Sequence, residues 1–294
     1  MTIAIRGGRV LPVTPDNEGR DHVWERGTVL IGDDGKIAAA GPEDDIEVPG
    51  DAMVVDAEGK VVTPGLIDAH THVGIGELAI GKEGADTNES TDPITPQVRA
   101  IDATYPGDIG FNDALSAGVT AVNVMPGSGN VIGGLAVLVK THGTRIDDMV
   151  VRHPTGLKAA MGENPKRSHG DQKKMPSTRL GIAALMRENL VKAQNYIEKH
   201  AAHERANDPT KTFERDIKME HIAMVLRGEI PMRWHAHRSD DILTALRIRD
   251  EFDFSMVLDH STEAHMLVDE LLERNIPAVV GPTLTARYKV ELKG

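Results

Sequence analysis

Two histidines, His70 and His72, alternate near the end of residues 59–74, which read GKVVTPGLIDAHTHVG. The run before them is apolar and rich in β-branched residues, which predicts a buried strand. Residues i and i+2 of a strand point to the same side, so both imidazoles can reach one ion from a single rigid element. This spacing suits zinc, manganese or another divalent metal, although partly buried histidines with ordinary hydrogen bonds can have the same spacing.

Further histidines close two later apolar runs. His235 and His237 end PMRWHAH, and His260 ends FSMVLDH, in each case before a predicted helix. In parallel α/β barrels the functional groups lie at the carboxyl ends of strands, so these positions have more weight than a histidine within a helix. Five strand-end histidines on three strands are hard to explain by packing alone. Five others are expected to be surface or packing residues, namely His153, His200, His203, His221 and His265.

The sequence around these histidines resembles a known family. VVTPGLIDAHTH resembles the first barrel strand of the amidohydrolase superfamily, whereas HAH and LDHSTE resemble its fifth and sixth strands. The resemblance implies that the metal ligands are His70, His72, His235 and His260. It also implies that His237 is a catalytic residue next to the ligands or facing the substrate, although His235 and His237 could exchange roles.

The stretch TGLKAAMGENPKR offers two further candidates for the metal site. Lys158 could be carboxylated, as in binuclear members of the superfamily, while Glu163 lies past the predicted strand end, where a ligand belongs. We favour Glu163. The words GENPK resemble an uncharacterised amidohydrolase group related to imidazolonepropionases and Xaa-Pro dipeptidases. Without a metal, Lys158 would reach a neighbouring backbone group and Glu163 would be a helix-start carboxylate.

Length and composition restrict the class of protein. The 294 residues suit one (β/α)8 barrel with a small appendage, and 40% hydrophobic with 27% charged residues excludes disordered and fibrous classes. The chain has no cysteine, so a metal must be held by His, Asp, Glu or a modified Lys. The net charge of -12, with no signal peptide and no apolar span, argues against nucleic acid and membrane as partners and predicts a cytoplasmic protein.

The pattern of elements predicts two domains. Residues 1–60 hold short strand-like runs with turns at Gly7-Gly8, Asp34-Gly35 and Glu58-Gly59, which resembles the small β-sandwich beside amidohydrolase barrels. Residues 61–294 alternate strands with helices, which predicts an α/β fold, a TIM-type barrel with about seven strands present. A long helix is expected within residues 176–207, with Ser177 as its N-cap, and another within residues 213–228.

Two loops accompany the predicted strands. Residues 74–110 are polar and without periodicity, which predicts a long active-site loop. The glycine-rich residues 127–134 lack the Gly-Lys-Ser/Thr ending of a phosphate loop and precede a strand, so we expect a tight backbone loop at a strand end.

One expected residue is missing. In the resembling superfamily an aspartate that closes strand 8 transfers the proton, but no eighth strand is visible before Gly294. Asp259 is expected to be no substitute, because adjacent strand residues point to opposite faces. We therefore expect either a fragment or a crippled relative, unstable or protected as a homo-oligomer. Arg287 and Lys289 are expected over the barrel mouth, where they could bind a substrate carboxylate or lie in a solvated loop.

These patterns predict a metal-dependent hydrolase of an amide or cyclic amide bond in a small-molecule substrate. One or two divalent ions, with zinc as our choice, would lower the pKa of a bound water and polarise the carbonyl. Two alternatives stay open: a deaminase of a nitrogen heterocycle, and a truncated metal-binding relative that has lost its proton-transferring aspartate.

Overall fold

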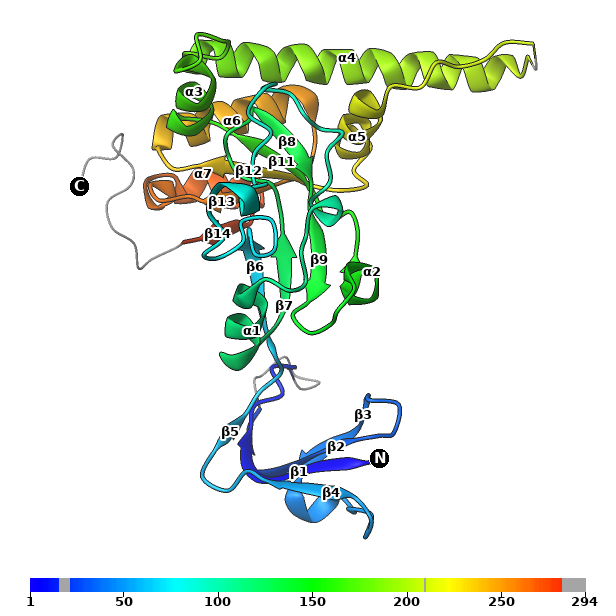
Figure 1. Ribbon diagram of the computed structural model, residues 1–294, viewed down its shortest axis with the longest axis vertical. Coiled ribbons are helices and arrows are strands. Elements are labelled where there is room, and N and C mark those ends of the chain that lie inside the picture. The colour runs from blue at the N-terminus through cyan, green and yellow to red at the C-terminus, as the bar shows by residue number, and fades with distance from the viewer. Residues whose placement is uncertain (16–21, 209, 282–294) are drawn as a thin grey trace. The chain divides into compact units, whose positions relative to one another are not determined.

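The computed structural model describes residues 1–15, 22–208 and 210–281 (Figure 1). The chain is a mixed α/β protein, and its described residues form three β-sheets. It divides into two compact units, Met1–Leu66 and Ile67–Gly294. None of the helices in these described ranges is both long and apolar enough to span a bilayer.

The first unit is one sheet built around its first strand. Its strands are β1 (Ile3–Val10), β2 (Trp24–Ile31), β3 (Ile37–Pro42), β4 (Met53–Asp56) and β5 (Val61–Val62). β1 pairs antiparallel with β2 and parallel with β4 and β5. The turn predicted at Asp34-Gly35 joins β2 to β3, with φ of +74° at Gly35. The turn predicted at Gly7-Gly8 is wrong, because these residues lie inside β1 at a bulge, which φ of +83° at Gly7 permits.

The second unit contains two sheets. The four-stranded sheet has the order β10-β9-β7-β6, with β6 (Leu66–Thr71), β7 (Val119–Val124), β9 (Val137–Lys140) and β10 (Val150–Arg152). The five-stranded sheet has the order β14-β13-β12-β11-β8, with β8 (Ile132–Leu135), β11 (Leu157–Ala160), β12 (Met232–Ala236), β13 (Met256–His260) and β14 (Ala278–Val280). The strands from β11 to β14 are parallel, as the alternation of strands and helices predicts, and β8 is antiparallel to β11.

Helices connect and cover these strands (Figure 1). They are α1 (Ile109–Ser116), α2 (Ile146–Met149), α3 (Glu163–Gly170), α4 (Arg179–Ala206), α5 (Ile217–Leu226), α6 (Ser239–Phe252) and α7 (Val268–Glu273). The N-cap of α4 is Thr178 rather than Ser177, because the Thr178 hydroxyl accepts a hydrogen bond from the amide of Gly181 at 3.0 Å. The helix expected after His260 is split into a short 3-10 turn and α7, on which Val268 and Leu272 are exposed.

The central strand β12 is buried on both faces. Met232, Trp234 and Ala236 belong to the aliphatic core shared with α4, α5 and α6, where Trp234 stacks on Phe254 at 6.2 Å between ring centroids. Strand alternation directs Arg233 and His235 to the opposite face, and both are also buried. The sheet therefore has an apolar helix side and a polar buried side.

Residues 86–99 pack directly on the glycine-rich residues 127–134. Gly133 and Gly134 belong to β8, so the predicted loop is in part a strand. Isolated parallel bridges join Ile94 to Ile132 and Arg99 to Leu135. A Cβ atom at Gly134 would overlap the carbonyl oxygen of Val98. Glycine is needed here because another backbone approaches closely, which is a reason independent of phosphate binding.

The side chain of Asn130 links the glycine-rich residues to residues 86–99. Its Nδ2 atom donates to the carbonyl oxygen of Glu89 and to Oγ1 of Thr95, each at 2.8 Å. Its Oδ1 atom lies 3.0 Å from Nε2 of the buried His169 in α3. One amide side chain thus joins the glycine-rich run, the overlying segment and α3.

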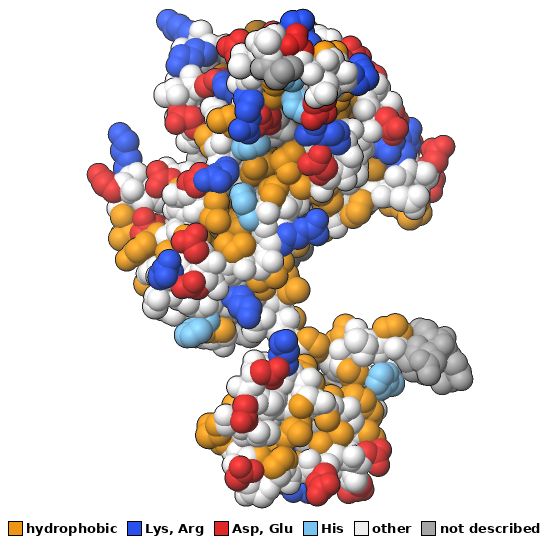
Figure 2. Space-filling view, turned by 90° about the vertical axis from the view of Figure 1, so that its right-hand side faces the viewer, with side chains coloured by type: hydrophobic (Ala, Val, Ile, Leu, Met, Phe, Trp, Pro, Cys, Tyr) orange, Lys and Arg blue, Asp and Glu red, His pale blue; other side chains and the backbone are white. Residues whose placement is uncertain are grey.

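The charged surface is mixed in sign. On the face of the second unit that Figure 2 shows, acidic and basic side chains are interspersed, and neither sign dominates. Several of these charges pair with each other, as Arg187 does with Glu251 and Arg215 with Glu220. This face presents no extended basic area of the kind that binds nucleic acid.

Candidate metal centre

Histidines from the two sheets of the second unit meet at the carboxyl ends of their strands. His70 and His72 come from the end of β6, His235 and His237 from the end of β12, and His260 from the end of β13. The ring centroids of His70 and His72 are 5.3 Å apart, and the ring of His260 lies 4.6 Å from those of both His70 and His235. The five histidines singled out in the sequence are therefore close together, with His260 between the two pairs.

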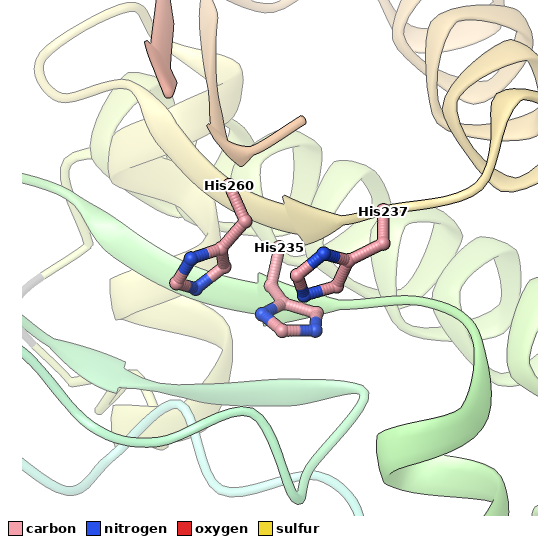
Figure 3. A group of neighbouring side chains, drawn as sticks. All are labelled: His235, His237 and His260. Atoms are coloured by element: carbon pink, nitrogen blue, oxygen red, sulfur yellow. The ribbon is translucent and has the colours of Figure 1, made fainter. Parts of the chain in front are cut away.

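Three of these histidines form a compact group (Figure 3). One ring nitrogen each of His235, His237 and His260 lies within 4.8 Å of the others. The rings of His237 and His260 are stacked, with 5.0 Å between centroids, and His235 approaches both nearly edge-on. These three nitrogens are of the type that holds a divalent ion in proteins.

Backbone carbonyl groups determine which nitrogen carries the proton in two of the rings. Nδ1 of His72 lies 2.7 Å from the carbonyl oxygen of Met125, and Nδ1 of His260 lies 2.7 Å from that of Gly281. A carbonyl can only accept, so Nδ1 of each neutral ring has the proton and Nε2 has the lone pair. The lone pair is the part of an imidazole that binds a metal.

A carboxylate and an ammonium fix His70 in the same way. Its Nδ1 atom lies 3.0 Å from Oδ1 of Asp259, an ion-pair contact that favours a proton on this nitrogen. Its Nε2 atom lies 3.4 Å from Nζ of Lys158, which donates. Both neighbours place the lone pair of His70 on Nε2.

The rings on β12 are held by hydroxyl groups. Nδ1 of His235 lies 2.8 Å from Oγ of Ser128, and its Nε2 atom lies 3.4 Å from Nδ2 of Asn164, a donor. Nδ1 of His237 lies 2.7 Å from Oγ1 of Thr262. Each of the five rings thus has an oxygen at Nδ1, which is the arrangement that orients histidine ligands in metal sites. The residues present fit a divalent metal.

A buried charge cluster lies behind His70. Asp259 is fully buried and receives two hydrogen bonds from Arg233, and Nζ of the fully buried Lys158 lies 3.9 Å from its Oδ2 atom. Arg233 also donates to the carbonyl oxygen of Ala69 at 3.0 Å. Burial lowers the pKa of Lys158 to about 8. The attraction of Asp259 opposes this lowering, and the repulsion of Arg233 adds to it. Burial alone would raise the pKa of Asp259, but His70, Lys158 and Arg233 together hold it below its usual range.

The two histidines of β6 are neutral at physiological pH. Burial, assisted by the charge of Lys158, lowers the pKa of His70 to about 3 and that of His72 to about 4. A neutral ring has a lone pair to offer, so protons do not compete for these nitrogens near pH 7.

Asp259 corrects the sequence-based expectation that it points away from the site. The alternation of strand faces holds only for extended backbone, and His260 and Ser261 have φ of +72° and +50°. The chain turns at His260, so Asp259 and the His260 ring both contact His70. The available signal was a carboxylate directly after the apolar run FSMVL and before a histidine, because a buried aspartate needs a partner.

The remaining predicted residues have different outcomes. Glu163 is the first residue of α3, and its role as a ligand stays a prediction. Arg287 and Lys289 lie outside the described residues. Ser128 was missed, because a single serine in a glycine-rich run has no pattern that indicates a partner more than a hundred residues away.

A cavity of about 650 Å³ lies under residues 86–99, with Asp86, Asn88 and Gly127 in its lining. None of the five histidines of the candidate centre lines it.

Comparison with known proteins gives a consistent result. No family model matches the chain. A solved structure of an amidohydrolase from Thermotoga maritima MSB8 is 42% identical, with a TM-score of 0.91 over 99% of this chain and 73% of that one. Amidohydrolase tasK of Hapsidospora irregularis is 32% identical over 297 residues, which is 91% of this chain and 29% of that protein. An imidazolonepropionase of Geobacillus sp. (strain WCH70) is 39% identical over 75 residues, 24% of this chain and 18% of that enzyme. The chain thus spans less than a third of the length of these two curated relatives.

Proposed function

The chain belongs to the amidohydrolase superfamily, in its imidazolonepropionase-like group, and we propose that it is a metal-dependent hydrolase of an amide or cyclic amide bond in a small molecule. One observation above all supports this: five imidazoles from two sheets converge, each with an oxygen at Nδ1. Pre-oriented neutral imidazoles are costly to bury unless they bind something, and a divalent cation is the ligand that they suit.

The proposed ligands are His70, His72, His235 and His260. Imidazoles without thiolates favour zinc among the common divalent ions, and one or two ions could occupy the centre. When bound, the metal supplies Lewis acidity that polarises a carbonyl group and lowers the pKa of a water molecule. The chain's own part is to hold Nε2 of each ring toward the ion through the contacts at Nδ1.

A fifth ligand could come from Lys158 or Glu163. The contact of Lys158 Nζ with Nε2 of His70, at 3.4 Å, supports Lys158, because an ammonium and a divalent cation cannot share that lone pair. Loss of a proton from this ammonium, addition of the amine to carbon dioxide and loss of a second proton would give a carbamate anion that can bind metal. Mass spectrometry of the metal-loaded chain separates the two residues: a labile carboxyl group on Lys158 supports the lysine, and its absence supports Glu163.

His237 is proposed as the catalytic residue that faces the substrate and moves the proton. It lies one residue beyond the end of β12, where barrel enzymes place substrate contacts, and Thr262 holds its Nδ1 atom. His237 also belongs to the three-histidine group, so its role must be separated from that of a ligand. If it is catalytic, His237→Gln retains the metal and loses turnover; if it is a ligand, the same variant loses metal.

We also propose a fold for the two domains, an oligomeric state and a cellular compartment. Similarity to the Thermotoga amidohydrolase supports a TIM-type barrel fold in residues 61–294 and a small β-sandwich domain in residues 1–60. A homo-oligomer in the cytoplasm stays a prediction.

The test combines metal content with a substrate panel. Elemental analysis of the purified chain should find zinc or another divalent metal, reduced in His70→Ala and His235→Ala but not in His203→Ala on the remote helix α4. Lactams, dipeptides and aminated heterocycles are then offered to the loaded protein. Hydrolysis of lactams or dipeptides supports the proposal, ammonia release from the heterocycles alone supports a deaminase, and metal without turnover supports a non-catalytic relative. A chain without metal would refute all three.

A further inference from the structure

The connection between β7 and β8 joins the two sheets of the second unit. β7 ends at Val124 in the four-stranded sheet, and β8 begins at Ile132 in the five-stranded sheet. The histidines of the candidate centre come from both sheets, two from β6 and three from β12 and β13. The spacing between these two sets therefore depends on whatever spans the sheets near them.

This connection contacts one histidine from each sheet. The carbonyl oxygen of Met125 lies 2.7 Å from Nδ1 of His72, and three residues later Oγ of Ser128 lies 2.8 Å from Nδ1 of His235. Both Ser128 and His235 are buried, so water does not readily replace this contact. The Asn164 amide donor beside Nε2 of His235 leaves the ring proton on Nδ1, so the serine oxygen is the acceptor.

The backbone on both sides of Ser128 is itself fixed. The amide of Gly127 donates to the carbonyl oxygen of Thr87 at 2.7 Å, and the amide of Gly129 donates to Oδ1 of Asn88 at 2.6 Å. A Cβ atom at Gly129 would lie 2.8 Å from that same Oδ1 atom. The glycines thus let residues 87 and 88 approach closely, and this approach anchors the peptide that presents the Ser128 hydroxyl.

We propose that Ser128 is a positioning residue for His235, and that the Met125–Gly129 connection sets the spacing between the histidines of the two sheets. An oxygen at Nδ1 fixes the tautomer and the ring orientation and makes Nε2 a better electron-pair donor. Without the Ser128 oxygen, the ring of His235 can flip about its Cβ–Cγ bond, and the buried N–H group at Nδ1 loses this acceptor. This inference rests on the proposed function, because it assigns Ser128 its role through the metal centre.

The test measures metal affinity rather than turnover. Zinc affinity is determined by competition with a chromophoric chelator for the wild type, Ser128→Ala and Ser128→Thr. Alanine should weaken binding by about 10–100-fold, the usual effect of losing such a partner, and threonine, which retains the hydroxyl, should restore most of it. The visible spectrum of the cobalt-loaded protein should change in Ser128→Ala and return toward wild type in Ser128→Thr. Thr141→Val is the matched control, because it removes a buried hydroxyl that bonds to Val119 at the start of β7.

Asn88→Ala gives a second measurement should Ser128→Ala fail to fold. It removes the acceptor of the Gly129 amide without touching a histidine, and it should weaken zinc binding by several-fold, less than the serine variant does. Equal zinc affinities and cobalt spectra for wild type, Ser128→Ala and Asn88→Ala would overturn the inference while leaving the proposed function intact. A wild-type chain that binds neither zinc nor cobalt would overturn both.

Discussion

Oδ1 of Asp259 lies 3.0 Å from Nδ1 of His70, so a carboxylate of the five-stranded sheet holds an imidazole of the four-stranded sheet. Arg233 strengthens this link, because it binds Asp259 and the carbonyl oxygen of Ala69, the residue before His70. The orientation of the first proposed ligand therefore depends on residues that come more than 160 positions later in the chain.

Asp259→Asn should destabilise the fold and weaken metal binding together. The variant leaves Arg233 and Lys158 buried without their anion, which costs about 3–5 kcal/mol when one partner of a buried pair is removed. Zinc affinity should fall by about 10–100-fold. Urea denaturation and chelator competition measure the two effects. Glu251→Gln is the control, since its partner Arg187 is at the surface and its loss should cost less than about 1 kcal/mol; equal costs for the two variants would contradict the prediction.

Acid should destabilise the metal-free chain below pH 6.5. The pKa values of about 3 for His70 and about 4 for His72 lie below the ordinary 6.5, so between these values the unfolded chain binds protons that the folded chain does not. The free energy of unfolding therefore falls as the pH falls below 6.5, by about 2 kcal/mol for each residue at pH 5, and the loss continues to about pH 4 for His72 and about pH 3 for His70. Urea denaturation with chelator at pH 7 and pH 5 measures the loss. A double variant, His70→Gln with His72→Gln, should lose much less stability on acidification, and an unchanged loss would rule out this origin.

Zinc should raise the melting temperature of the wild-type chain. A ligand that binds only the folded state at 100 times its Kd adds about 2.7 kcal/mol to the free energy of unfolding. Calorimetry with and without zinc measures the shift. His260→Ala should lose most of it, because His260 lies between both histidine pairs, whereas His200→Ala on α4 should keep it. A shift of the same size in His260→Ala would place the zinc elsewhere.

Gly134→Ala should destabilise the second unit without altering the histidines. The added methyl group meets the carbonyl oxygen of Val98, which is backbone and cannot rotate away, so the strain should cost about 1–3 kcal/mol. Faster amide exchange at Thr95, which bonds to the carbonyl oxygen of Ile132, should accompany the loss. Gly181→Ala in α4 meets no atom closer than 3.4 Å and should be neutral or stabilising. Amide exchange at Thr95 as slow in Gly134→Ala as in the wild type would contradict the close approach of the Val98 carbonyl oxygen to Gly134.

Local patterns in the sequence are sufficient to find the histidines. His70, His235 and His260 each end an apolar run, and the carboxyl ends of parallel strands meet at one side of a sheet. The spacing of His72 and His237, two residues after a partner, then places each beside that partner. Residue type and strand periodicity therefore single out the five histidines, whereas the choice of four of them as ligands came from the resemblance to the amidohydrolase superfamily.

The partners of these histidines are not predictable in this way, and the reason is physical. Asp259 faces His70 only because His260 has a positive φ, and the residue types at these positions do not indicate a positive φ. Ser128 and Met125 contact histidines that are distant in sequence, and such contacts depend on how the two sheets lie together. β8 was missed because glycines at two of its four positions have low strand propensity.

Asn130 imposes a narrow chemical choice at one position of the chain. Its side chain donates twice, to Glu89 and Thr95, and its oxygen faces His169, so both ends of the amide are used. Aspartate has the shape but lacks the donors, leucine has neither donor nor acceptor, and glutamine is one methylene too long. Hydrolysis of this amide to a carboxylate would turn its attraction to the Glu89 carbonyl oxygen into repulsion, so one change of functional group would remove both side-chain hydrogen bonds from residue 130 to the overlying segment.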